Sequence, residues 1–229
     1  MATPRFHRYA IYHLPTGSLG RFGAAWLGWD PVTARYRPND ETCEWTAIPR
    51  RYGFHATLKA PFELRESATV DALDAAAEAL AQSLAPVHIS ALEPTWLGRF
   101  LALVPSAPSP ELCALADQCV TTLDPFRRPT PEKDREKYEA RNLSAELQSN
   151  LATWGYPYVL DAFRFHLTVT GRVPKAARPA VETALASRLP DMTQGYTLDR
   201  ISLMGEDADG WFHQINAYSL AACPAGSDK

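Results

Sequence analysis

Two segments about half a chain apart alternate between apolar and polar residues with a period of two, as side chains do on a β-strand. The apolar face of residues 51–62 comprises Tyr52, Phe54, Ala56, Leu58 and Ala60. The apolar face of residues 163–170 comprises Phe163, Phe165, Leu167 and Val169. The opposite, polar faces carry His55 and Thr57 in the first segment, and His166 and Thr168 in the second. Each segment therefore predicts a strand with one face in the core and a His-x-Thr pair on the other.

Apolar residues spaced by three and four positions predict helices between these strands. Helices are expected over residues 18–28, with Ser18 as the N-cap, and over 69–84, 110–123, 144–154 and 175–188. Further strands are expected over residues 8–14 and in two hairpins, 87–92 with 100–104 and 198–204 with 211–220. Residues 30–50 show no clear period, so they are expected to form an irregular connection.

The order of these elements repeats along the chain. Each half is expected to run helix, His-x-Thr strand, helix, hairpin, and the two histidines are 111 positions apart (166 − 55). A Pro/Ser linker over residues 105–110 marks the middle. The pattern predicts one α+β domain made of two pseudo-symmetric lobes, about residues 1–108 and 109–229. Its two antiparallel sheets, flanked by helices, would surround a central cleft.

The composition narrows the class of partner. The chain has 229 residues, 46% of them hydrophobic, with a formal net charge of −3 and a pI near 6.1. It has no broad basic field, so extended binding to nucleic acid or to an anionic membrane is disfavoured, whereas a small anionic substrate needs only a local positive pocket. No apolar run approaches the roughly 18 residues that span a bilayer, and the N-terminal residues lack a signal-peptide pattern. A cytoplasmic protein without membrane contact is expected.

The spacing of the cysteines and the absence of common cofactor-binding motifs indicate that no metal or cofactor takes part. Cys43, Cys113, Cys119 and Cys223 show no metal-ligand spacing, so reduced thiols are expected. The chain has no His-Glu-x-x-His helix, no Gly-x-x-x-x-Gly-Lys-Ser/Thr loop, no Gly-x-Ser-x-Gly elbow and no Gly-x-Gly-x-x-Gly. A metal site built on the two motif histidines stays open as an alternative, although no carboxylate stands beside either of them.

The two His-x-Thr pairs suit acid–base catalysis at phosphorus. If a pseudo-twofold axis relates the halves, His55 and His166 meet across a shared cleft. In-line displacement needs a base that takes a proton from the attacking hydroxyl or water and an acid that protonates the leaving oxygen, and imidazole does either near neutral pH. Thr57 and Thr168 could donate hydrogen bonds to the non-bridging oxygens. The alternative is two half-buried strand histidines satisfied by their neighbours, and the sequence does not decide which histidine is the acid.

Three cations are candidates for binding an anionic substrate. Lys59 lies on the same predicted face as Thr57, where it could add a positive charge or be a solvated lysine at a strand end. Residues 124–142 are dense in charge and proline, which favours a solvated loop running into an exposed helix. The alternative is a mobile flap that brings Arg127 or Arg128 over the ligand.

For two tyrosines and one histidine, the sequence leaves two alternative locations open. Tyr156 and Tyr158 could stack on a base, but they are expected in the core. His13 is expected to be a surface or packing residue, with a place at the rim of the cleft as the alternative.

The motifs carry a resemblance to a known family. His55-Ala-Thr-Leu58 and His166-Leu-Thr-Val169 resemble the two signatures of the 2H phosphoesterase superfamily, also called the LigT-like fold. The amino-acid sequence of residues 51–62, 154–158 and 163–168 is similar to that of a bacterial branch of phosphonate-metabolism proteins of unknown function. The resemblance covers nearly the whole chain and implies a bilobal fold with a central cleft.

The resemblance also implies an activity. It implies metal-independent hydrolysis or transesterification of a 2′,3′-cyclic nucleotide or another cyclic ribosyl phosphate, such as phosphoribosyl 1,2-cyclic phosphate, with the two His-x-Thr pairs at the signature positions. The partner would be a small phosphorylated ribose or nucleotide. RNA ends are a further candidate, through ligation or 3′–5′ exonuclease activity at the same site. A binding module without turnover is the alternative from another class, and the oligomeric state is left open.

Overall fold

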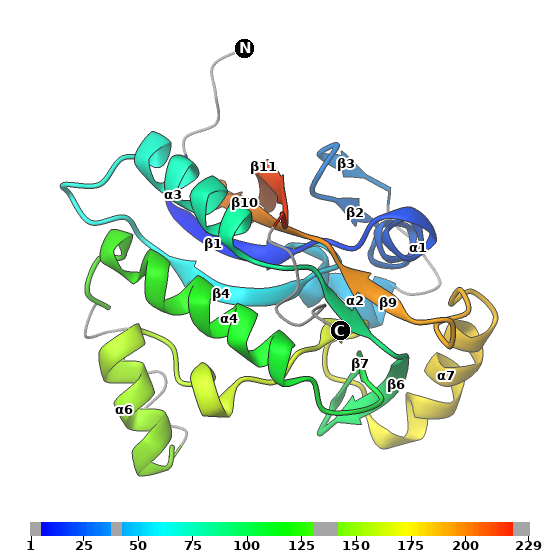
Figure 1. Ribbon diagram of the computed structural model, residues 1–229. Helices are drawn as coiled ribbons and strands as arrows, with labels where there is room; N and C mark the ends of the chain where they lie inside the picture. The colour runs from blue at the N-terminus through cyan, green and yellow to red at the C-terminus, as the bar shows by residue number, and fades with distance from the viewer. Residues whose placement is uncertain (1–5, 38–42, 131–141, 222–229) are drawn as a thin grey trace, which may run out of the picture.

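The computed structural model describes residues 6–37, 43–130 and 142–221. Within these ranges the chain forms helices and antiparallel sheets, which confirms the predicted α+β class (Figure 1). None of the helices in the described ranges has the length and apolar character needed to cross a bilayer.

The largest sheet has four strands in the order β11-β10-β1-β4, and all neighbouring pairs are antiparallel. Its strands are β1 (Arg8–His13), β4 (Ala56–Phe62), β10 (Arg200–Glu206) and β11 (Phe212–Ser219). The predicted C-terminal hairpin is confirmed, because β10 and β11 pair along their whole length. β4 is the edge strand of this sheet and carries the first His-x-Thr pair, with His55 directly before its first residue.

The second sheet has three antiparallel strands, β6 (Leu92–Leu97), β7 (Phe100–Pro105) and β8 (Leu167–Thr168), in that order. β6 and β7 form a hairpin with its turn at Gly98 and Arg99. The predicted first strand, residues 87–92, is wrong as a partner of this hairpin. β5 (Val87–Ile89) instead pairs with β9 (Tyr196–Leu198), because the tight turn fixes the register of β7 against residues 92–97.

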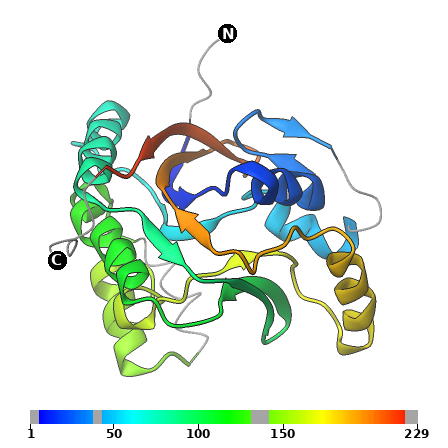
Figure 2. The same cartoon turned by 45° about the vertical axis from the view of Figure 1, so that its right-hand side comes forward.

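The β5–β9 pair joins the two halves of the chain. The pair lies between the two larger sheets (Figure 2). His88 is opposite Thr197 in this antiparallel pair, and these residues are 109 positions apart (197 − 88), close to the spacing of the two motif histidines. Each larger sheet takes strands from both halves of the chain, so the sheets do not coincide with the lobes expected at residues 1–108 and 109–229.

The helices pack around these sheets. They are α1 (Gly17–Leu27), α2 (Cys43–Arg50), α3 (Val70–Ser83), α4 (Pro110–Leu123), α6 (Ala145–Trp154) and α7 (Arg178–Ala186). Short 3-10 turns are η1 (Asp124–Phe126), η2 (Leu160–Ala162) and η3 (Lys175–Ala177). α3 and α4 lie side by side, α3 against β10 and β11 and α4 against β4 (Figure 1). Side chains of Thr69, Ser109 and Ser144 cap α3, α4 and α6, each accepting a hydrogen bond from a backbone N–H in the first turn.

Both faces of the four-stranded sheet are buried. Tyr9 and Ile11 of β1 belong to the main core, together with Leu73 and Ala77 of α3. The opposite face of β1 contributes to a smaller cluster, which comprises Ala10, Tyr12, Leu14, Met204 and Phe212 with Tyr52 against it. Because successive strand residues point to opposite faces, β1 supplies the core with one set and the side of the sheet that bears His55 with the other.

Two local predictions are wrong. Ser18 does not cap α1, which begins at Gly17 with Thr16 as its N-cap, because the Gly20 N–H already donates to the Thr16 carbonyl. The described residues between 30 and 50 do not form the irregular connection expected, since they include the end of β2 (Trp29–Asp30), its partner β3 (Arg35–Tyr36) and the helix α2. α2 gives little periodic signal because it is short and has a proline in its last turn, and its buried Arg50 donates to the Leu27 carbonyl.

The second His-x-Thr segment is a much shorter strand than predicted. Only Leu167 and Thr168 are in β8, since the N–H groups of Val169 and Thr170 both donate to the carbonyl of Leu101 and end the ladder. The apolar alternation is confirmed nevertheless. The buried side chains are Phe163, Phe165, Leu167 and Val169.

His13 generates a prediction about stability. The residue is 1% exposed, its Nδ1 is 2.8 Å from the Arg200 carbonyl oxygen and its Nε2 contacts the Tyr196 hydroxyl. Burial lowers the pKa of His13 to about 4. Between that value and the reference value of about 6.5, the unfolded chain binds a proton that the folded chain does not, so stability falls as the pH falls through this window.

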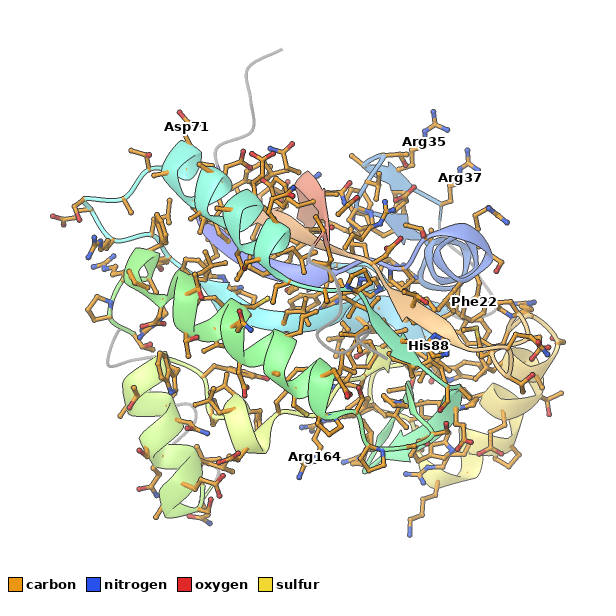
Figure 3. All side chains as sticks on the ribbon, viewed as in Figure 1. Phe22, Arg35, Arg37, Asp71, His88 and Arg164 are labelled. Carbon is orange, nitrogen blue, oxygen red and sulfur yellow. The ribbon has the colours of Figure 1, made fainter. Side chains whose placement is uncertain are left out.

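We expect His13 alone to lower the free energy of unfolding by about 2 kcal/mol between pH 7.5 and pH 5. In urea titrations at the two pH values, the loss in His13→Gln should be about 2 kcal/mol smaller than the loss in the wild type, to which His55 also contributes. His88→Gln is the matched control, because His88 is an exposed histidine at the surface (Figure 3), and it should lose as much as the wild type. Equal losses in the wild type and His13→Gln would contradict the assignment.

Candidate active site

A cavity of about 600 Å³ lies beside β4, the edge strand of the four-stranded sheet. Its walls come from β1, α2, β4 and β7, and from residues 127–130, 154–159 and 168–172. His55 and Thr57 line it from one sheet, and Thr168 lines it from the other. The structure thus brings the two predicted polar segments to one cavity, although they are more than a hundred residues apart.

His55 is held by three contacts. Its ring stacks on Tyr12 with the centroids 3.8 Å apart and the planes at 22°. Nδ1 lies 2.9 Å from the Gly53 carbonyl oxygen, to which only a protonated nitrogen can donate, so Nε2 carries the lone pair of the neutral ring. Nε2 is 3.1 Å from Oγ1 of Thr57, whose hydroxyl donates to it. Gly53 has φ +75°, a conformation that favours glycine, and it places this carbonyl under the imidazole.

The surroundings keep His55 neutral. Burial lowers the pKa of His55 to about 4, the hydrogen bond to Gly53 opposes this shift, and the charge of His166 adds to it. The imidazole is therefore unprotonated near neutral pH. A neutral ring with its Nε2 lone pair on the wall of a cavity is the form that a general base requires.

His166 repeats the local arrangement of His55. It directly precedes β8, as His55 directly precedes β4, and its Nδ1 is 2.8 Å from the carbonyl oxygen of Arg164, again two residues earlier. The ring of His166 is 5.9 Å from that of Phe100, which lines the cavity. His166 is half-buried and is not among the residues that line the cavity, although Thr168 of the same motif is. Both histidines thus have Nδ1 fixed by the backbone.

Lys59 lies on the cavity wall but is not solvated. It is 3% exposed, and its ammonium group donates to the Val120 carbonyl at 3.0 Å and to Asp124 at 3.1 Å. Val120 is in the last turn of α4, where carbonyl groups lack helical partners and attract a cation. The solvated alternative is therefore wrong, because burial against the helix end gives the ammonium group partners that water would otherwise supply.

Arg127 and Arg128 line the cavity from the segment that follows α4. Arg127 is bidentate on Asp124, at 2.7 and 3.1 Å, and also donates to the Thr153 carbonyl at 2.8 Å. Arg128 is more exposed and pairs with Glu63 at 3.0 Å. Residues 124–130 are thus anchored to the protein, while the remainder of the predicted loop or flap, residues 131–141, lies outside the described residues.

The two tyrosines are not core residues. Tyr156 is half-buried and lines the cavity, and Tyr158 is 40% exposed. Their rings meet edge to face at 5.6 Å. The expectation of burial is wrong because the αL turn at Gly155 ends α6 and directs the following residues along the cavity edge. His13 likewise does not reach the rim, since it is enclosed between Arg200 and Tyr196.

Several lining residues were not found from the sequence. They include Arg8, Tyr12, Tyr52, Trp154 and Arg172. Arg8 is bidentate on the buried Glu206, with one N–O distance of 2.7 Å. Alternation along β1 does place Arg8 and Tyr12 on one face, but no sequence signal showed that this face adjoins the histidine. Within the described ranges, no group of three or more His, Cys, Asp or Glu side chains is arranged to hold a metal ion.

Comparison with known proteins relates the chain to one family. A family model described as "Protein of unknown function (DUF1045)" matches residues 57–213. A protein of Janthinobacterium sp. (strain Marseille) named ribose 1,5-bisphosphate phosphokinase PhnN is 34% identical over 186 residues, which are 77% of this chain and 41% of that protein. The chain thus spans about two fifths of the length of this curated relative.

Solved structures with a similar arrangement include phosphoesterases of the LigT type. LigT of E. coli in its apo form is 14% identical, with a TM-score of 0.48 over 95% of this chain and 99% of that chain. The protein TT0787 of Thermus thermophilus is 17% identical, with a TM-score of 0.46 over 94% and 98%. At these identities and scores the likeness says nothing about the chemistry of this chain.

The stacked pair generates a prediction. Tyr12→Ala should admit water beside His55, which reduces the cost of charging the ring and raises its pKa from about 4 towards about 6.5. Tyr12→Phe keeps the aromatic ring and should keep the low pKa. NMR titration of the imidazole Cε1–H resonances measures both values. A wild-type pKa of His55 near that of a free imidazole would contradict the description.

Proposed function

This chain belongs to the DUF1045 family, whose description gives no activity, and we propose that it is a phosphodiesterase that hydrolyses a cyclic phosphate without a metal ion. One observation carries the proposal. His55, Thr57 and Thr168 line one cavity, His166 directly precedes the strand of Thr168, and each histidine has Nδ1 hydrogen-bonded to the carbonyl two residues before it. Two histidines with a purely structural role would not need to share this hydrogen-bond geometry beside a cavity that is lined by cations.

We propose distinct roles for the two histidines. Neutral His55 takes a proton from water through Nε2 as the water oxygen attacks phosphorus. The bond from phosphorus to one ring oxygen breaks, and His166, protonated at its outer nitrogen, donates a proton to that oxygen. The product is a phosphomonoester with a free hydroxyl, and transfer of the proton from His55 to His166 through solvent restores both groups. The Thr57 hydroxyl turns from Nε2 of His55 to the substrate, which frees the lone pair, and Thr57 and Thr168 donate hydrogen bonds to the non-bridging oxygens, where charge develops.

The chemistry of a relative favours a ribosyl substrate. The Janthinobacterium protein is named for ribose 1,5-bisphosphate. Opening 5-phosphoribosyl 1,2-cyclic phosphate at the bond between phosphorus and O2 leaves the phosphate on O1 and yields that compound. This chain lacks a Gly-x-x-x-x-Gly-Lys-Ser/Thr loop and spans two fifths of the relative, so the phosphokinase activity is not transferred to it. A role in phosphonate metabolism accords with this substrate.

A 2′,3′-cyclic nucleotide is the second candidate. Tyr156 and Trp154 on the cavity wall offer aromatic faces on which a base could stack. The cavity volume of about 600 Å³ is within the range usual for small-molecule sites. RNA ends would use the same aromatic wall, and only the first nucleotide would enter.

Replacement of either histidine should abolish most of the activity. In EDTA, His55→Ala and His166→Ala should each lower kcat on the cleaved substrate by at least about a hundredfold, since each removes one proton transfer. Thr57→Val and Thr168→Val should cost about tenfold to a hundredfold through loss of one hydrogen bond each. The assay uses ribosyl 1,2-cyclic phosphates, nucleoside 2′,3′-cyclic phosphates and a cyclic-ended RNA. His88→Ala is the control and should retain wild-type kcat, while full activity in both active-site histidine variants would refute the mechanism.

A further inference from the structure

The segment after His166 presents polar side chains to the cavity at every second residue. The cavity side comprises Thr168, Thr170 and Arg172. The core side includes the buried Leu167, Val169 and Val173. Arg172 therefore stands on the same wall as Thr168, at the end where the chain leaves β8, and its side chain is exposed.

The backbone on both sides of Arg172 is fixed. The N–H of Gly171 donates to the Trp45 carbonyl of α2 at 2.6 Å, and the N–H of Val173 donates to the Arg99 carbonyl at 2.7 Å. A Cβ at Gly171 would lie 3.3 Å from the same Trp45 oxygen, so the chain runs close against α2 here. A guanidinium on a fixed backbone loses less freedom when it binds a ligand than one on a free loop.

The cations of the cavity differ in whether they are paired with a carboxylate. Five cations line the cavity within the described ranges, and four are paired: Arg8 with Glu206, Lys59 and Arg127 with Asp124, and Arg128 with Glu63. Arg172 has no hydrogen-bond or ion-pair partner among the described residues. Five cations and three carboxylates leave an excess of two positive charges, in a chain whose net charge is −3. A cyclic phosphodiester brings one negative charge, whereas a phosphomonoester adds about 1.5 to 2 more.

Arg172 also distinguishes the two ends of the pseudo-symmetric site. It lies six positions after His166, and the residue six positions after His55 is Pro61. Both residues line the cavity, but only Arg172 carries a charge. A charged group at one end alone would bind an asymmetric ligand in one orientation.

Building on the proposed function, we propose that Arg172 binds a second, terminal phosphate of the substrate. The substrate is then a cyclic phosphate that also carries a phosphomonoester, and hydrolysis of the cyclic bond yields a bisphosphate. The planar guanidinium suits bidentate binding of phosphate oxygens. The cyclic phosphate occupies the cavity beside His55, Thr57 and Thr168, and the terminal phosphate lies at the rim beside α2.

Calorimetry with two product analogues tests the subsite without turnover. The wild type should bind ribose 1,5-bisphosphate more tightly than ribose 1-phosphate, by about thirtyfold, since a charge-assisted hydrogen-bond pair is removed in the second ligand. Arg172→Ala should lose most of this preference, and Arg172→Lys should keep part of it. Arg35→Ala removes an exposed arginine on β3, away from the cavity (Figure 3), and should behave as the wild type.

Kinetics on 1,2-cyclic ribosyl phosphate with and without a 5-phosphate separate the two proposals. Arg172→Ala should lower kcat/KM for the phosphorylated substrate about thirtyfold more than for the other. An unchanged preference for the bisphosphate in Arg172→Ala would overturn the subsite, even if the enzyme hydrolyses both substrates. Loss of the preference in a protein that hydrolyses no cyclic phosphate would support the subsite and overturn the proposed function.

Discussion

The stacking of His55 on the buried ring of Tyr12, with Nδ1 bonded to the Gly53 carbonyl, is the contact on which the site depends. A charged imidazole in this position would lose its hydration, so the ring stays neutral and keeps the Nε2 lone pair available. The rest of the fold makes this possible. β1 brings Tyr12 beside the strand of His55, and Thr57 is opposite Tyr12 in the register of the two strands.

Most of the cations around the cavity are paired with carboxylates. The half-buried carboxylate of Asp124 holds both Lys59 and Arg127, and the end of α4 accepts a further hydrogen bond from the buried Lys59. Buried charges are tolerated when they are paired and hydrogen-bonded, so these side chains are positioned before any ligand binds. Arg172 is different because it is exposed and unpaired among the described residues. The site thus combines paired cations, whose side chains are held in place, with one unpaired cation, Arg172, at the rim.

The sequence predicted what depends on local periodicity. The strand of His55, the helices α3, α4 and α6, and the His-x-Thr pairs all follow from the spacing of apolar and polar residues. It missed what tertiary contacts decide. α2 is fixed by a buried arginine, β5 finds its partner more than a hundred residues away, and β8 is cut short by a carbonyl that accepts two hydrogen bonds. Arg8, Tyr12 and Arg172 become site residues only because distant segments meet, which no single stretch of sequence reveals.

The most direct test of the central claim is the reaction of 5-phosphoribosyl 1,2-cyclic phosphate in ¹⁸O-labelled water with EDTA, followed by ³¹P NMR. If water attacks phosphorus as described, the cyclic resonance disappears, ribose 1,5-bisphosphate forms, and one ¹⁸O is found on the phosphate at C1. A parallel sample of the protein lacking both motif histidines should leave the substrate intact. No turnover of this or any other cyclic phosphate by the folded wild-type protein, or label on carbon rather than phosphorus, would contradict the account.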